Sequence, residues 1–119
     1  MKTMLQIKRV YEEPSKEDGY RILVDRLWPR GISKERAQLD EWLKEVGPSN
    51  ELRKWFHHEP EKFDVFKEKY ADELGAGKAK EAFSHLQTLV AKHQNVTLVY
   101  GAKDTLDNQA VCLKEWLEK

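Results

Sequence analysis

The sequence predicts a small α/β fold in which a mainly parallel sheet is covered by helices on both faces. Two observations predict it. Residues 20–25 and 96–100 are short segments that are apolar almost throughout, as in strands buried on both sides of a sheet. Longer segments with apolar residues at helical spacing lie between and after these strands, which is typical of chains that build parallel sheets.

The first part of the chain is predicted to form two strands joined by a turn. Residues 4–10 predict a first strand, because Leu5, Ile7 and Arg9 would lie on one face and the residues between them on the other. Residues 12–19 are charged and rich in turn-forming residues, so they favour a turn or at most one helical turn. The strand over residues 20–25 is followed by a helical turn over residues 34–38. Residues 39–46 fit either a strand or a helix, and the spacing of their apolar side chains favours a helix.

The second part of the chain is predicted to be mainly helical. Ser49 can cap one helix, and Pro60 suits the first turn of the next. A further helix over residues 78–93 precedes the last strand, at residues 96–100. The final helix is expected to start at about residue 105, because apolar residues recur from there at helical spacing.

Size and composition restrict the class of protein. The 119 residues fit one α/β domain, residues 1–119, and the 21 basic residues balance the 21 acidic ones. This charge balance argues against general nucleic-acid binding and against a membrane-surface patch, because each of them needs an excess of Lys and Arg. A lone cysteine suits a reducing compartment. No apolar run is long enough for a signal peptide or a membrane span, so the cytoplasm is the expected location.

Ligands of parallel α/β sheets bind where the carboxyl ends of the strands open into a crevice. Three segments follow predicted strands and are therefore expected at that edge: residues 9–11, 25–31 and 101–104. These segments contain most of the candidate ligand-binding residues.

The most informative segment is the arginine-rich loop at residues 25–31. Arg26 and Arg30 each offer a planar fork of donors that matches a carboxylate or phosphate, so they predict an anion site beside Asp25 and Trp28. The alternative has equal weight. In it, Asp25 and Arg26 form an ion-pair network within the protein, and Trp28 belongs to the core.

Five further residues are candidates to extend this site. Arg9 and Lys103 would add positive charge, and Asn108 would orient the ligand. Tyr11 would donate a hydrogen bond from its hydroxyl, and Tyr11 and Asp104 would be the groups able to handle a proton. Structural roles compete with each of these. Arg9 could pair with a neighbouring glutamate, Lys103 could be a solvated charge, and Asp104 is favoured as the cap of the last helix.

Other polar residues are interpreted as structural. Ser49, Arg53 and His57 are spaced by four residues, so they share one helix face. The expected roles are structural: Ser49 caps the start of the helix, and His57 complements its C-terminus. The adjacent His57 and His58 are only a weak metal motif, and no metal site is expected. Cys112 is expected to be buried or half-buried and chemically inert.

The chain resembles a known family along nearly its whole length. The resemblance is carried most specifically by the run from Val24 to Gly31, together with the residues that precede it and with scattered matches in the middle and at the end of the chain. The matching segments are residues 8–11, 18–31, 40–42, 48–49, 51–54, 56–57, 97–100 and 102–103, with Asn108 and Ala110. On these residues the chain is identified as a member of the YeaO-like family of bacterial proteins.

The resemblance implies a small bacterial or archaeal α/β protein and brings no established activity. Many members of the broader superfamily carry a Cys-His-Arg motif on the last helix. The corresponding stretch here is Asp107-Asn108-Gln109, which lacks the cysteine and the histidine. The resemblance therefore does not extend thiol or metal chemistry to this chain.

The sequence thus supports the hypothesis of a protein that binds a small anion, with a phosphate or carboxylate, in an arginine-rich cleft. It assigns no catalytic residue, cofactor or oligomeric state. One alternative is a protein-interaction or regulatory module anchored by Trp28 and Trp55. Nucleic-acid binding through the same arginines is a second alternative, and the neutral net charge disfavours it.

Overall fold

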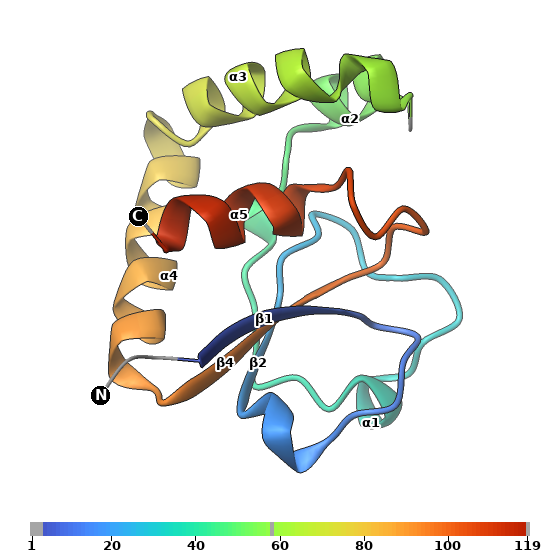
Figure 1. Ribbon diagram of the computed structural model, residues 1–119, viewed down its shortest axis with the longest axis vertical. Helices are drawn as coiled ribbons and strands as arrows, with labels where there is room; N and C mark the ends of the chain where they lie inside the picture. Colours follow the sequence, from blue (N-terminus) through green and yellow to red (C-terminus); the bar gives the residue numbers. More distant parts are fainter. Residues whose placement is uncertain (1–3, 58, 119) are drawn as a thin grey trace.

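A computed structural model describes residues 4–57 and 59–118 (Figure 1). Within these residues, four parallel strands form one sheet in the order β1-β4-β2-β3. The strands are β1 (Met4–Arg9), β2 (Tyr20–Leu23), β3 (Glu41–Trp42) and β4 (Asn95–Tyr100). The predicted α/β class with a parallel sheet is confirmed.

The register of the strands brings three chain segments to one edge of the sheet. Arg9 at the end of β1 pairs with Tyr100 at the end of β4, and Leu23 at the end of β2 pairs with Val99. All three strands therefore end at the same level. The residues that follow them, which the sequence predicted to share a crevice, start side by side.

Helices cover both faces of the sheet. Figure 1 shows α5 between the sheet and α3, and α1 on the opposite side of the sheet. The helices are α1 (Lys34–Ala37), α2 (Asn50–Phe56), α3 (Phe63–Glu73), α4 (Gly77–Lys92) and α5 (Gln109–Leu117). Single 3-10 turns occur at η1 (Lys16–Asp18), η2 (Lys44–Val46) and η3 (Pro60–Lys62).

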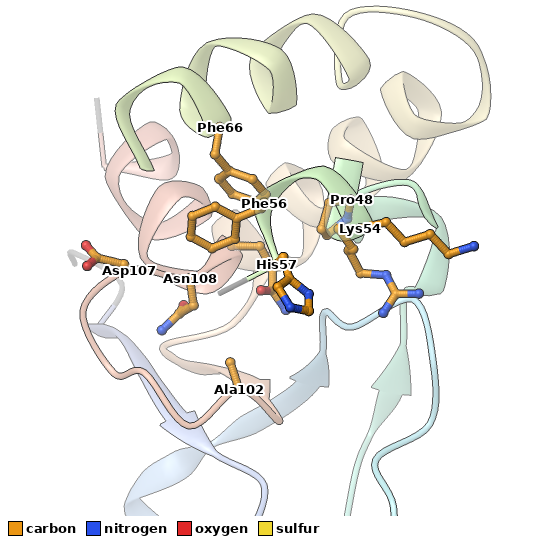
Figure 2. A pocket seen from close by; sticks show the side chains of 10 residues that line it. Pro48, Lys54, Phe56, His57, Phe66, Ala102, Asp107 and Asn108 are labelled. Carbon is orange, nitrogen blue, oxygen red and sulfur yellow. The ribbon is translucent and has the colours of Figure 1, made fainter. Parts of the chain in front are cut away.

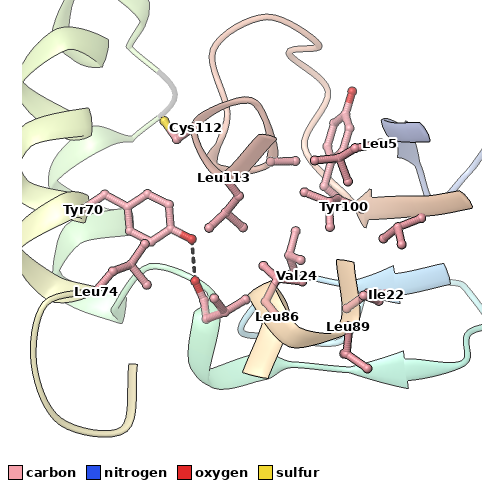
Figure 3. Close-up of a cluster of buried hydrophobic side chains, with 14 of the residues drawn as sticks. Leu5, Ile22, Val24, Tyr70, Leu74, Leu86, Leu89, Tyr100, Cys112 and Leu113 are labelled. Atoms are coloured by element: carbon pink, nitrogen blue, oxygen red, sulfur yellow. Dashed lines mark hydrogen bonds between the residues drawn. The ribbon is translucent and has the colours of Figure 1, made fainter. Parts of the chain in front are cut away.

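The larger core lies between the sheet and helices α2 to α5 (Figure 3). Because side chains of a strand alternate between its faces, Ile22, Val96 and Leu98 point into this core while their neighbours point away. The buried Tyr70 of α3 donates a hydrogen bond to the carbonyl of Val46, and its ring packs against Trp116 of α5. This contact ties α3 to the loop that precedes α2.

The opposite face has a small apolar cluster and a buried ion pair. Leu23 and Val99 pack there against Ala37 of α1. Beside them the buried Arg21 donates to Asp18, with 2.5 Å between Nη1 and Oδ2, and also to the carbonyl of Ala37. Arg21 therefore joins β2, η1 and α1 through one guanidinium.

Two expectations from the sequence are wrong at the level of elements. Residues 39–46 form β3 and the turn η2 instead of a helix, because the amide of Leu43 donates to the carbonyl of Leu23 and adds this segment to the edge of β2. The last helix starts at Gln109 rather than near residue 105. Asn108 is its N-cap, so the cap predicted at Asp104 is also wrong.

None of the helices within the described residues is long and apolar enough to cross a membrane. This agrees with the absence of a long apolar run in the sequence.

We expect Asp18→Ala to lower the free energy of unfolding by about 3–5 kcal/mol, because it leaves the buried Arg21 without its counter-charge. Urea denaturation measures this change. The control is Glu118→Ala, which breaks the exposed pair of Lys114 and Glu118 and should change the free energy by less than about 1 kcal/mol. Equal losses in the two variants would contradict the role given to Asp18.

Candidate functional site

A cleft of about 420 Å³ opens beside the carboxyl ends of the strands, and we call it the arginine cleft. Five residues predicted from the sequence line it together: Tyr11, Asp25, Arg26, Trp28 and Arg30. Residues from the loop before α2, from α2 itself, from the end of β4 and from α5 complete its walls, among them Pro48, Arg53, Gly101 and Gln109.

Hydrogen bonds to backbone carbonyls fix the arginine-rich loop. Tyr11 Oη donates to the carbonyl of Arg30 at 2.9 Å, and Trp28 Nε1 donates to that of Ile32 at 2.7 Å. Trp42 of β3 donates from Nε1 to the carbonyl of Asp25 at 2.7 Å. The loop is therefore held from within and from two other segments, so its shape is set before any ligand arrives.

Arg26 has a structural role at the wall of the cleft. Its Nε and Nη2 donate to the carbonyls of Pro48 and Gly47, and its Nη1 lies 3.5 Å from Glu45 Oε2. The two backbones approach closely at this point. A Cβ on Gly47 would lie 2.6 Å from the amide nitrogen of Arg26, so only glycine fits there. Most of the donors of Arg26 therefore connect the arginine-rich loop to the loop before α2.

Asp25 connects three elements at the base of the cleft. Its Oδ2 accepts from the amide of Gly101 at 2.8 Å, and its Oδ1 accepts from the side-chain amide of Gln109 at the start of α5. Burial raises the pKa of the Asp25 carboxyl to about 6, and the Gly101 amide, Arg53 and Gln109 oppose that rise. The carboxylate is therefore close to half-protonated near pH 6.

Arg53 lines the cleft with a guanidinium that the described residues satisfy only in part. Ser49 caps α2 by accepting from the amide of Leu52, and this places Arg53 one turn into the helix, facing the cleft. Its Nη2 donates to Asn50 Oδ1 at 2.6 Å. Its Nε is buried, and among the described residues it has no hydrogen-bond partner. A buried donor without a partner costs free energy that a ligand can recover.

Arg30 is the second available cation. Its side chain is exposed at the mouth of the cleft, and within the described residues its guanidinium makes no hydrogen bond or ion pair. Arg30 and Arg53 thus differ from Arg26, since each keeps at least one guanidinium nitrogen without a hydrogen-bond partner among the described residues.

The other candidates from the sequence lie around the cleft without lining it. Arg9 donates to the carbonyls of Gly101 and Ala102 and lies over the ring of Tyr11, with 4.9 Å from its Cζ to the ring centroid. It holds the loop after β4 instead of pairing with a neighbouring glutamate. Lys103 is exposed, while Asp104 accepts from the amides of Leu106 and Asp107 and so shapes the turn before α5.

Asn108 lines a neighbouring cavity and is occupied as a helix cap. Its Oδ1 accepts from the amide of Val111, and its Nδ2 donates to the carbonyl of Asp104. Both ends of the side-chain amide are engaged, so Asn108 helps to form the wall of the cavity but offers few free hydrogen-bonding groups to a ligand.

The neighbouring cavity, of about 310 Å³, is called here the aromatic pocket. Phe56 and Phe66 form one side and Ala102 the other, with His57 and Asn108 between them (Figure 2). It shares Pro48, Arg53, Ala102 and Gln109 with the arginine cleft, so the two hollows adjoin.

Sequence reasoning missed two residues of the site. Arg53 was assigned to a structural helix stripe, and Gln109 was noted only at the position of the superfamily motif. The one available signal was the spacing of Ser49, Arg53 and His57, which places Arg53 on the face of α2 next to its cap. Nothing in the local sequence indicates that this face meets the end of β2.

Thiol chemistry has no support in this site. Cys112 is fully buried in α5, as predicted, and burial raises its pKa to about 12, so its thiol stays protonated. The weak metal motif includes His58, which lies outside the described residues.

The chain is similar to several curated proteins. An uncharacterized protein of Escherichia coli, YeaO, is 50% identical over 113 residues, which are 95% of this chain and 96% of that protein. Uncharacterized proteins of Mycobacterium bovis and of Mycobacterium tuberculosis are each 50% identical over 72 residues, 60% of this chain and 61% of theirs. No solved structure matches the chain.

The model of one protein family matches residues 4–119. Its description is the inactive DUF488-N3 subclade. Together with the relative from Escherichia coli, this match covers nearly the whole chain, as the resemblance in the sequence predicted. The chain therefore belongs to the YeaO-like DUF488 family, within the subclade whose model is described as inactive.

Proposed function

We propose that this protein binds a small anion bearing a phosphate or carboxylate group in the arginine cleft, without transforming it. Arg53 is the principal donor to the anion and Arg30 the second. The observation that carries the proposal is that Arg53 lines the cleft with a guanidinium whose Nε is buried and has no hydrogen-bond partner among the described residues.

The charge distribution of the cleft supports an anionic ligand. Three arginines line it, and Asp25 is the one acidic residue among its described lining residues. The donors of Arg26 are engaged by Glu45 and by backbone carbonyls, which leaves Arg30 and Arg53 facing a single, partly protonated carboxyl. A ligand with one or two negative charges balances this set.

Binding without catalysis is supported by the chemistry available. The family model is described as inactive, and the thiol of Cys112 is buried with a pKa of about 12. Tyr11 Oη donates to the carbonyl of Arg30, and both oxygens of Asp25 accept hydrogen bonds. These hydrogen bonds fix the loops around the cleft, so Tyr11 and Asp25 each have a structural role that requires no catalysis.

We expect Arg53→Ala to weaken the binding of inorganic phosphate by about tenfold or more, because a charge-assisted hydrogen bond at a buried donor is lost. Arg30→Ala, at the exposed mouth, should weaken it by about threefold. Isothermal titration calorimetry measures both affinities.

The matched control for these two variants is Lys80→Ala, which removes one positive charge from the exposed surface of α4. It should leave phosphate affinity unchanged. If all three variants bind phosphate as the parent does, or if the parent binds no anion, the proposal is wrong, and Trp28 and Trp55 are to be tested as anchors for a protein partner.

The affinity for sulfate should rise as the pH falls through about 6. Above that pH the Asp25 carboxyl is ionised and repels the anion, whereas below it protonation removes the repulsion. We expect sulfate, whose own charge is constant over this range, to bind about five- to tenfold more tightly at about pH 5 than at about pH 7.5. Linkage requires that bound sulfate raise the pKa of Asp25 in turn.

Asp25→Asn is the control for this pH dependence. Its side-chain oxygen can still accept from Gly101, and the amide of Gln109 can turn to meet it. The variant should bind sulfate tightly at both pH values. A parent and a variant with the same pH profile would show that Asp25 does not control anion binding.

A further inference from the structure

We propose that the anion is an aromatic one, whose charged group contacts Arg53 in the arginine cleft and whose ring lies in the aromatic pocket. This inference rests on the proposed function and specifies the class of its ligand. An aryl phosphate or an aromatic carboxylate fits the description, whereas a bare inorganic anion occupies only half of the site.

The two hollows adjoin at Arg53. This residue lines both of them, as do Pro48, Ala102 and Gln109. A ligand group bound by the guanidinium of Arg53 therefore lies at the boundary, and whatever is attached to it can extend into the aromatic pocket. The continuity comes from the chain itself, because Arg53 and the pocket residues Phe56 and His57 belong to the same short helix and its cap.

The chemistry of the aromatic pocket favours a flat apolar ring. The rings of Phe56 and Phe66 lie together, with 4.6 Å between their centroids, and form a continuous aromatic wall. Figure 2 shows Ala102 across the pocket from that wall, and Pro48 adds an apolar side. Aromatic rings gain from stacking or edge contacts in addition to the burial of their area, so this wall prefers an aromatic ring to an alkyl group.

Apart from His57, which lies between the aromatic wall and Ala102, the polar residues of the pocket lie at its edges or are already engaged. Asn108 uses both ends of its amide as a helix cap. In Figure 2, Lys54 and Asp107 lie at opposite sides of the pocket, away from Ala102. The pocket therefore offers mainly apolar contact, with Arg53 and His57 as its polar groups, and its volume of about 310 Å³ is within the range that holds small organic ligands.

The test compares two phosphate monoesters that differ only in the attached group. Phenyl phosphate and methyl phosphate are both dianions at about pH 8, so their charged groups are matched. Calorimetric titration of the full chain should show phenyl phosphate binding at least about tenfold more tightly, because only its ring buries area against the aromatic wall.

The location of the ring is tested by Ala102→Leu, which fills the pocket from the side facing Phe56. The ratio of the two affinities should fall to about one to two, whatever the change in phosphate affinity itself. Phe56→Leu removes the aromatic surface while keeping an apolar side chain, and should lower the ratio by about threefold. Ala91→Leu, an exposed change of the same size on α4, should leave the ratio unchanged.

Three results overturn the inference, and they differ in what they say of the proposed function. Equal affinity for both esters shows an anion site without a site for a ring, so the proposed function stands and the inference fails. A tenfold preference that survives Ala102→Leu shows that the ring binds elsewhere. Failure of the parent to bind either ester contradicts the proposed function as well.

Discussion

The cleft depends on one carboxyl group. Asp25, just after β2, accepts hydrogen bonds from Gly101, which follows β4, and from Gln109, which begins α5. Parallel pairing brings β2 and β4 to a common edge, and the Asp25 side chain links the loops that follow them to α5. The same carboxyl is shielded enough from water for its pKa to rise to about 6. The residue that builds the site therefore also sets its charge.

The cations around the cleft divide according to what they bind. Arg9 and Arg26 donate to backbone carbonyls and hold loops, while Arg21, on the other face of the sheet, forms a buried pair with Asp18. Arginine suits this work because one rigid guanidinium can satisfy several carbonyls. Arg30 and Arg53 line the cleft, and the Nε of Arg53 has no partner among the described residues, which the proposed anion would bring to this guanidinium. An unsatisfied buried donor is uncommon in folded proteins, which is why Arg53 carries weight.

The sequence predicted the sheet, most helices and the loop that lines the cleft, because these depend on local patterns. Apolar runs predicted β2 and β4, and the rule for parallel sheets predicted that residues 9–11 and 25–31 meet near one edge. It could not predict β3, since residues 39–46 have helical spacing and become a strand only by pairing with β2. Arg53 was missed for a related reason. Its role comes from the packing of α2 beside the end of β2, and no local pattern encodes that approach.

The most direct measurement of the central claim is the NMR signal of the Arg53 Nε–H during titration of the isotope-labelled protein with inorganic phosphate. The account predicts that this signal shifts and saturates with phosphate, while the Nε–H of Arg21, which already donates to the carbonyls of Ala37 and Gln38, stays in place. An Arg53 signal that does not move at saturating phosphate would contradict it.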